Sequence, residues 1–104
     1  MNQEQDRMQL YELTELLKVL AHPVRLCIVR GLWRNGSCNV THMQNCLDVP
    51  QSTVSQHLGK LRQAGIIEGN RNGLEILYSL KDERIKVLLS CLFEQIGTER
   101  CEKI

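Results

Sequence analysis

The stretch QSTVSQHLGKLRQAG, residues 51–65, decides the fold of this 104-residue chain. Val54, Leu58 and Leu61 recur at helical spacing, which predicts a helix over residues 51–64 with one apolar side and Gly65 at its carboxyl end. The other sides carry short hydrogen-bonding groups rather than the Glu and Lys typical of a solvated helix. Such groups suit contacts with base edges in DNA, and an ordinary polar face is the alternative.

Two helices are predicted at the start of the chain. Leucines at positions 10, 13, 17 and 20 have the spacing of an amphipathic helix over residues 5–20. His22-Pro23 interrupts it, and because proline fits the first turn of a helix, a second helix should run from Pro23 to the Asn35-Gly36 pair.

A short third helix is predicted over residues 40–47, just before the deciding stretch. Asn39 or Thr41 can cap it, and Thr41 followed by Gln44 has the spacing of a capping box. Val49-Pro50 ends this helix. The third helix and the helix over 51–64 are therefore joined by a short turn.

A β-hairpin and a final helix follow. Residues 66–68 and 74–79 are β-rich runs around the turn sequence Asn70-Arg71-Asn72-Gly73, which predicts a hairpin. Apolar residues at positions 85, 88, 89, 92 and 96 predict a helix over residues 82–99.

This order of elements predicts a mainly α fold with a β-hairpin wing, the winged helix-turn-helix, in one domain over residues 1–104. In that fold the helix over 51–64 fits the DNA major groove, and the hairpin reaches the neighbouring backbone or minor groove. The helices over 5–20 and 82–99 carry more apolar surface than one small core needs, so we expect them to form a homodimer.

Composition fits an ordinary globular protein, with 42% hydrophobic and 24% charged residues. The net charge is +1, but residues 22–80 carry +3, residues 1–21 carry −2 and the remainder is neutral. A basic middle suits a surface that meets phosphate, although +3 is modest. The start of the chain lacks signal-peptide blocks and no apolar run is long enough for a membrane span, so we expect a cytoplasmic location.

Three blocks of the sequence resemble the ArsR/SmtB family of bacterial repressors. They are AHPVRL at 21–26, QSTVSQHLGKLRQAG at 51–65 and RNGLEILYSL at 71–80. The likeness extends over residues 10–96 and is nearest to the branch that senses thiol oxidants or persulfides and to virulence-gene repressors without an evident inducer site. It implies a homodimer that binds an inverted-repeat operator in double-stranded DNA and is released by an effector.

The resemblance places the operator contacts on the deciding helix. They are Gln51, Ser52, Thr53, Ser55, Gln56 and His57. Lys60, Arg62 and Arg25 are candidates for phosphate contacts, and Arg71 is the candidate probe at the hairpin tip. Two alternatives stay open: His57 as a buried histidine satisfied by hydrogen bonds, and Arg25 in a surface ion pair.

The metal sites of the family have no counterpart in this sequence. Asn39 and Thr41 stand where a CxC pair of thiolates would bind a thiophilic ion. Of the zinc site between the last helices only Asp82 is kept, because Arg84, Gln95 and Thr98 replace the other ligands. We therefore expect no metal site and no cofactor.

The chain has five cysteines, an odd number that does not fit a disulfide scaffold in the cytosol. The thiol-sensing positions of the family are occupied by Arg30 and Gly97, so Cys27 and Cys91 are displaced from them. If helical, Cys38 and Cys46 would be about 12 Å apart, and Cys91 and Cys101 about 15 Å apart. Both spacings exceed the Cα separation of about 7 Å that a disulfide allows.

The effector candidates are Cys27 or Cys38 paired on oxidation with Cys91 or Cys101. The alternative is that Cys27, Cys46 and Cys91 are small buried hydrophobes and that Cys101 is exposed in a frayed tail.

The sequence thus predicts a DNA-binding repressor released by thiol oxidation or a thiophilic ion. A repressor without a small-molecule inducer and a winged-helix module for protein contacts are the alternatives. An enzyme is disfavoured, because the sequence has no Gly-rich phosphate loop, no HExxH and no CxxC.

Overall fold

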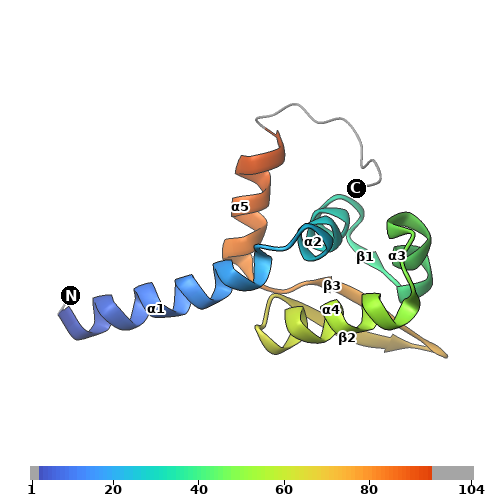
Figure 1. Ribbon diagram of the computed structural model, residues 1–104, viewed down its shortest axis with the longest axis horizontal. Helices are drawn as coiled ribbons and strands as arrows, with labels where there is room; N and C mark the ends of the chain where they lie inside the picture. The colour runs from blue at the N-terminus through green and yellow to red at the C-terminus, as the bar shows by residue number, and fades with distance from the viewer. Residues whose placement is uncertain (1–2, 95–104) are drawn as a thin grey trace.

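The computed structural model describes residues 3–94 and arranges them as a small helical domain with one sheet (Figure 1). The helices are α1 (Gln3–Leu20), α2 (Pro23–Asn35), α3 (Val40–Leu47), α4 (Gln51–Gln63) and α5 (Glu83–Glu94). The strands are β1 (Ser37–Cys38), β2 (Ile67–Asn72) and β3 (Glu75–Leu80). The predicted order of helices and hairpin is confirmed, and β1 is an element that the sequence did not predict.

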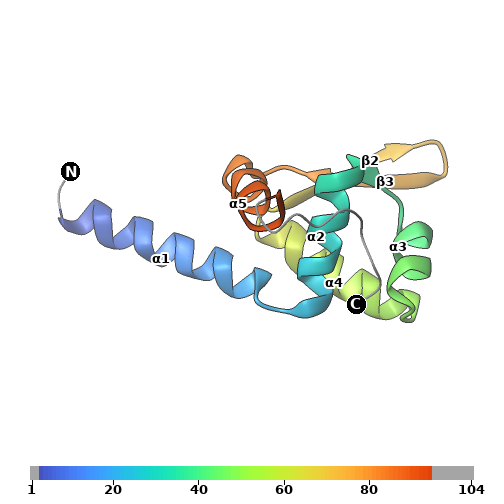
Figure 2. The ribbon, with the colours of Figure 1, turned by 90° about the horizontal axis from the view of Figure 1, so that it is seen from above.

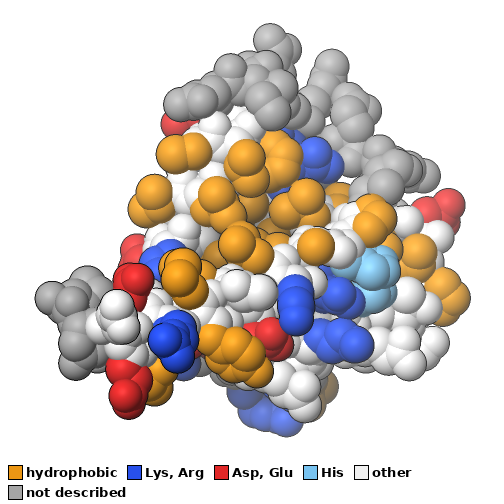
Figure 3. Space-filling model, turned by 60° about the vertical axis from the view of Figure 1, so that its left-hand side comes forward, with side chains coloured by type: hydrophobic (Ala, Val, Ile, Leu, Met, Phe, Trp, Pro, Cys, Tyr) orange, Lys and Arg blue, Asp and Glu red, His pale blue; other side chains and the backbone are white. Residues whose placement is uncertain are grey.

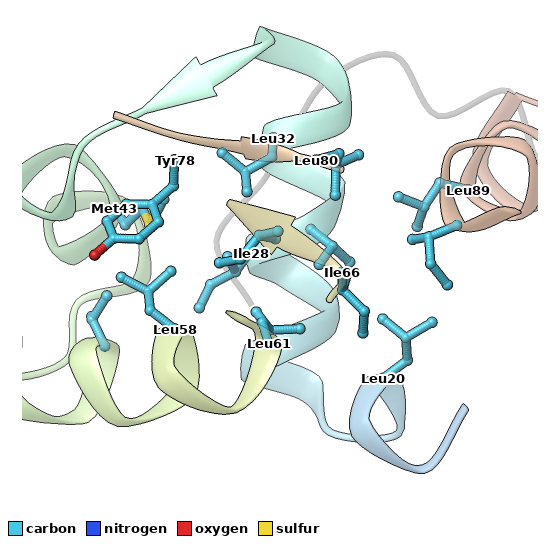
Figure 4. Packing of buried hydrophobic residues seen from close by; sticks show 14 of the residues in the cluster. Leu20, Ile28, Leu32, Met43, Leu58, Leu61, Ile66, Tyr78, Leu80 and Leu89 are labelled. Atoms are coloured by element: carbon cyan, nitrogen blue, oxygen red, sulfur yellow. The ribbon is translucent and has the colours of Figure 1, made fainter. Parts of the chain in front are cut away.

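The hydrophobic core lies between α2, α4 and the sheet, and it is closed by α5 and the end of α1 (Figure 4). Val29 of α2, Val54 and Leu61 of α4 and Leu89 of α5 have no exposed surface. Each of these side chains comes from the apolar side of its helix, so the amphipathic pattern of the sequence determines which side of each helix is buried.

α1 extends beyond the rest of the domain at its amino end (Figures 1 and 2). Only Leu16 and Leu20 of this helix are buried, whereas Leu10 and Leu17 are 58% and 51% exposed. Of the four leucines in the predicted stripe, only Leu20 is therefore buried in the core of its own chain, and Leu13 is half-buried. This leaves apolar surface on α1 for another partner.

Two helix starts are fixed by side-chain caps. The backbone N–H of Val24 donates to Nδ1 of His22 at 3.1 Å, directly before Pro23 opens α2. The backbone N–H of His42 donates to Oδ1 of Asn39 at 2.8 Å, so Asn39, and not Thr41, caps α3.

The sheet is antiparallel in the order β1-β3-β2. β2 and β3 pair as far as Asn72 and Glu75, which leaves Gly73-Leu74 as a two-residue loop. Gly73 has a φ of 70°, a value that glycine adopts without strain. The turn predicted at residues 70–73 is thus placed too early, because the strand continues to Asn72. Cys38 of β1 pairs with Tyr78 of β3.

α5 buries Ile85 and Leu89 and leaves Val87 and Leu92 63% and 42% exposed. The predicted end of this helix, at residue 99, lies outside the described residues. Among residues 3–94, no helix is both long and apolar enough to cross a bilayer.

Candidate nucleic-acid interface

α4 is held on the domain by its apolar side and presents a polar side to solvent. Val54, Leu58 and Leu61 are at most 3% exposed. The exposed residues of the helix include Gln51, Ser52, Ser55, Gln56, Lys60 and Arg62, whereas Thr53 and His57 are half-buried. Because the buried stripe fixes the rotation of the helix, the polar side chains share one outward surface.

The amino end of α4 is open for an anion. Pro50 precedes it without a side-chain cap, and its first turn contains no acidic residue. The first N–H groups of a helix lack intrahelical acceptors and carry partial positive charge, which attracts phosphate. Asp48, in the left-handed conformation with a φ of 60°, ends α3 and turns the chain toward α4.

His57 is held by residues of α2 and of the turn before it. A guanidinium nitrogen of Arg25 lies 3.1 Å from Nδ1 of His57. The rings of His22 and His57 have centroids 4.6 Å apart. Because arginine can only donate, Nδ1 of His57 accepts this hydrogen bond and the ring proton lies on Nε2. His57 is therefore half-buried and anchored on one ring nitrogen.

The charges around His57 disfavour a second proton on its ring. Burial contributes most, and the neighbouring His22, Arg25 and Lys60 add to it, so the pKa of His57 lies below its ordinary value of 6.5. A neutral imidazole with a proton on Nε2 can donate to an acceptor on a base or a phosphate.

Arg25 also has a structural role. Besides its contact with His57, its Nε donates to the carbonyl of Val19 at 2.5 Å. Among residues 3–94 it forms no ion pair with a carboxylate, so the alternative of a surface ion pair is wrong for the described chain. Arg25 connects α1, α2 and α4.

The wing, formed by β2, β3 and their loop, carries the exposed residues Arg71 and Leu74. Arg71 lies in β2 opposite Ile76, two residues before the loop rather than at the tip where it was predicted. Leu74, at the tip itself, is fully exposed. Nδ2 of Asn39 donates to Oε1 of Glu75 at 3.1 Å, which connects the start of α3 to the base of the loop. The sequence pattern predicts Leu74 in the second strand, but Leu74 lies in the loop because β2 continues to Asn72.

Lys and Arg side chains lie close to histidine on one face of the molecule (Figure 3). Hydrophobic side chains are exposed on the same face, above and beside these groups. Positive side chains gathered in this area suit contact with phosphate.

Among residues 3–94, Cys38, Cys46 and Cys91 are free thiols. Cys27 and Cys38 are half-buried and Cys46 and Cys91 are exposed, so the alternative that Cys46 and Cys91 are buried hydrophobes is wrong. Cys38 belongs to β1 and not to a helix, so the helical spacing of about 12 Å to Cys46 does not apply. Burial, and secondarily the nearby Cys46, raise the pKa of the Cys38 thiol. Cys101 lies outside the described residues, and the proposed oxidation pairs stay predictions.

Asp82, the one position kept from the family's zinc site, accepts hydrogen bonds from Arg84. Arg84 binds it with two side-chain contacts, of which the shorter is 2.8 Å, and these hydrogen bonds lower the pKa of Asp82. Within residues 3–94 no three His, Cys, Asp or Glu side chains are grouped so as to hold a metal ion.

Comparison with known proteins relates this chain to transcriptional repressors. A helix-turn-helix domain family matches residues 20–70. The chain is 45% identical over 85 residues to the transcriptional repressor PagR of Bacillus anthracis, across 82% of this chain and 85% of PagR. It is 46% identical over 71 residues to the HTH-type transcriptional repressor SmtB of Mycobacterium tuberculosis, across 68% of this chain and 52% of SmtB.

Solved structures share the same architecture. The crystal structure of PagR matches with a TM-score of 0.76 at 44% identity, across 83% of this chain and 98% of PagR. The structure of the repressor BigR from Xylella fastidiosa matches with a TM-score of 0.78 at 35% identity, across 96% and 100% of the two chains. A homodimeric winged helix-turn-helix DNA-binding domain from Mycobacterium bovis has a TM-score of 0.79 at 21% identity, covers 92% and 88%, and shares the fold alone.

Proposed function

This chain belongs to the ArsR/SmtB family of winged helix-turn-helix transcriptional repressors, and from that premise we propose that it binds operator DNA through the polar side of α4. The observation that supports this most strongly is the fixed rotation of α4. Its apolar stripe is buried, so Gln51, Ser52, Ser55 and Gln56 face outward together. One helix of this kind fits the width of the major groove.

The contacts divide by chemistry. Gln56 can both donate and accept at a base edge, and His57 presents an Nε2 donor because Arg25 occupies its other ring nitrogen. Gln51, Ser52 and Thr53 lie in the first turn, where the positive end of the helix dipole favours phosphate. Lys60, Arg62 and Arg71 supply positive charge for the DNA backbone. These residues form the proposed operator interface.

A homodimer completes the proposed function. α1 and α5 expose Leu10, Leu17, Val87 and Leu92, each at least 42% accessible in the single chain. Apolar side chains at such exposure on two neighbouring helices suit burial against a second copy. The two α4 helices would then enter successive major grooves about 34–36 Å apart, which requires an inverted repeat in the operator.

DNA binding can be tested with the upstream DNA of the protein's own gene in a fluorescence anisotropy titration. Binding to that fragment should be at least about a thousandfold tighter than to scrambled DNA of the same length. Footprinting should show two protected half-sites one helical turn apart. Equal affinity for both fragments would reject an operator-reading function.

A further inference from the structure

A cavity of about 360 Å³ lies between α2, β1 and α3. We call it the thiol pocket, because Cys27, Cys38 and Cys46 all line it, together with Ile28, His42 and Met43. Its volume is within the range of roughly 300–1,000 Å³ typical of small-molecule sites. Neither the proposed function nor the family's metal positions assign a role to it.

The lining of the thiol pocket favours an uncharged ligand. Ile28 and Met43 are buried and form part of an apolar floor. None of the residues that line the cavity is Asp, Glu, Lys or Arg. A charged ligand would lose its hydration in this cavity without gaining an opposite charge, whereas a small apolar molecule would bury its surface.

One thiol of the pocket has a base beside it. Sγ of Cys46 lies 3.7 Å from Nε2 of His42, one helical turn earlier in α3. Both side chains are exposed and both line the pocket, so a ligand can reach them directly from solvent. A thiol next to an imidazole is the usual arrangement of an activated sulfur nucleophile. Cys38 is the poorer nucleophile of the pocket, because burial raises the pKa of its thiol.

We propose that the thiol pocket binds a small uncharged electrophile of the α,β-unsaturated carbonyl class and that Cys46 captures it as a thioether. Nε2 of His42 accepts the thiol proton, and the sulfur adds to the β-carbon. The electron pair of the C=C double bond moves to form an enolate, which takes the proton back at its α-carbon. One S–C bond forms, one C–C π bond is lost, and no oxidant is needed.

An adduct in this pocket should alter the proposed operator interface, because the elements that line the pocket contact α4 and the wing. This part of the inference rests on the proposed function. α3 packs against α4, and the cap of α3, Asn39, binds Glu75 at the base of the wing loop. β1, which carries Cys38, pairs with β3 of the wing. A ligand bound between α2 and α3 should therefore displace α3, which contacts both α4 and the wing.

The first experiment measures the reaction itself, without DNA. The protein is treated with limiting N-phenylmaleimide, and alkylation of each cysteine is followed by peptide mass spectrometry. Cys91 is the internal control, because it is also an exposed thiol but lies on α5, away from the pocket; the reaction is run below the dimer dissociation constant, so that the proposed dimer contact of α5 does not shield it. Cys46 should react at least about tenfold faster than Cys91, and His42→Gln should remove most of that advantage.

A saturated analogue separates binding from reactivity. N-phenylsuccinimide has the same ring but no reactive double bond, so it should occupy the pocket and slow alkylation of Cys46 without slowing that of Cys91. Equal rates at Cys46 and Cys91 would overturn the proposal, and so would an absence of selective protection. Thermal unfolding of His42→Gln, whose side chain is exposed, checks that the variant folds.

The second experiment tests regulation. Alkylated protein should bind the upstream DNA about tenfold more weakly than untreated protein, and Cys46→Ser treated in the same way should keep its affinity. Unchanged affinity after complete alkylation of Cys46 would contradict the regulatory role. If untreated protein does not bind its upstream DNA selectively, the proposed function is wrong. The alkylation rates, measured without DNA, still test whether the thiol pocket binds an electrophile.

Discussion

At the scale of single residues, His57 shows how one side chain can serve both the fold and the interface. Its Nδ1 accepts from Arg25, its ring packs beside His22, and it is half-buried on the helix proposed to enter the groove. The sequence predicted a DNA contact with a buried histidine as the alternative. The structure bears out the alternative in part, because His57 is half-buried and, among residues 3–94, hydrogen-bonded through one ring nitrogen, and the DNA contact stays a prediction. Spacing along one helix could not reveal this, since the partners come from other segments.

The lowered pKa of His57 predicts a pH dependence of stability. The unfolded chain binds the proton at a higher pH than the folded chain, so the free energy of unfolding should fall as pH drops below about 6.5. His57→Gln should lose this part of the dependence. Urea unfolding at about pH 7.5 and pH 5.5 measures it for both proteins. An identical decline in the variant would show that His57 does not cause it.

Lys60 should act through charge alone. Its side chain is exposed on α4 beside the proposed operator contacts, so Lys60→Ala should weaken binding to operator and scrambled DNA alike. The slope of log affinity against log salt should fall by about one. Anisotropy titrations at several salt concentrations give this slope. An unchanged slope would place Lys60 away from phosphate.

At the scale of elements, helices were predicted closely because each has a buried stripe and a clear start. Pro23 opens α2 and Pro50 precedes α4, and these boundaries are visible in the sequence. β1 was missed because two residues are too short to show an alternating pattern, and its pairing with β3 is a long-range contact. The hairpin turn was placed early because Asn70 and Asn72 are typical turn residues that here lie in β2.

The hairpin loop yields a prediction with a matched control. Gly73 has a φ of 70°, so Gly73→Ala should strain the loop and lower the free energy of unfolding by about 1 kcal/mol or more. Gly31 lies inside α2 with nothing within 4 Å of an added Cβ, so Gly31→Ala should raise it by about 0.5–1 kcal/mol. Thermal or urea unfolding compares the two. The same sign for both would contradict the assigned loop conformation.

At the scale of the whole molecule, the sequence indicated that there is more apolar surface than the core needs. It did not indicate which apolar residues are buried in the core and which are exposed. Leu10 and Leu17 have the same pattern as core residues, yet α1 extends past the domain and leaves them exposed (Figure 2). The periodicity of a helix shows which side is apolar and does not show which partner covers it. The thiol pocket was also beyond the sequence, because α2, β1 and α3 come together only in three dimensions.

The proposed dimer can be tested by one charge on α5. Val87→Glu places a carboxylate on exposed apolar surface of that helix and should raise the dimer dissociation constant at least about tenfold. Leu74→Glu, on the fully exposed wing tip, is the control and should leave it unchanged. Sedimentation velocity over a range of concentrations gives both constants. A monomeric wild-type chain, or equal dimerisation of all three proteins, would reject this interface.

The proposed function depends most on the polar side of α4 lying against base pairs, and one comparison tests it directly. Affinities of Gln56→Ala and Gln63→Ala are measured for the upstream DNA and for scrambled DNA; both glutamines are exposed on α4, but Gln63 ends the helix. Gln56→Ala should lose about 1–3 kcal/mol of binding to the upstream DNA only, and Gln63→Ala should lose little. Equal losses in the two variants, or a loss shared by both DNAs, would contradict base recognition by this helix.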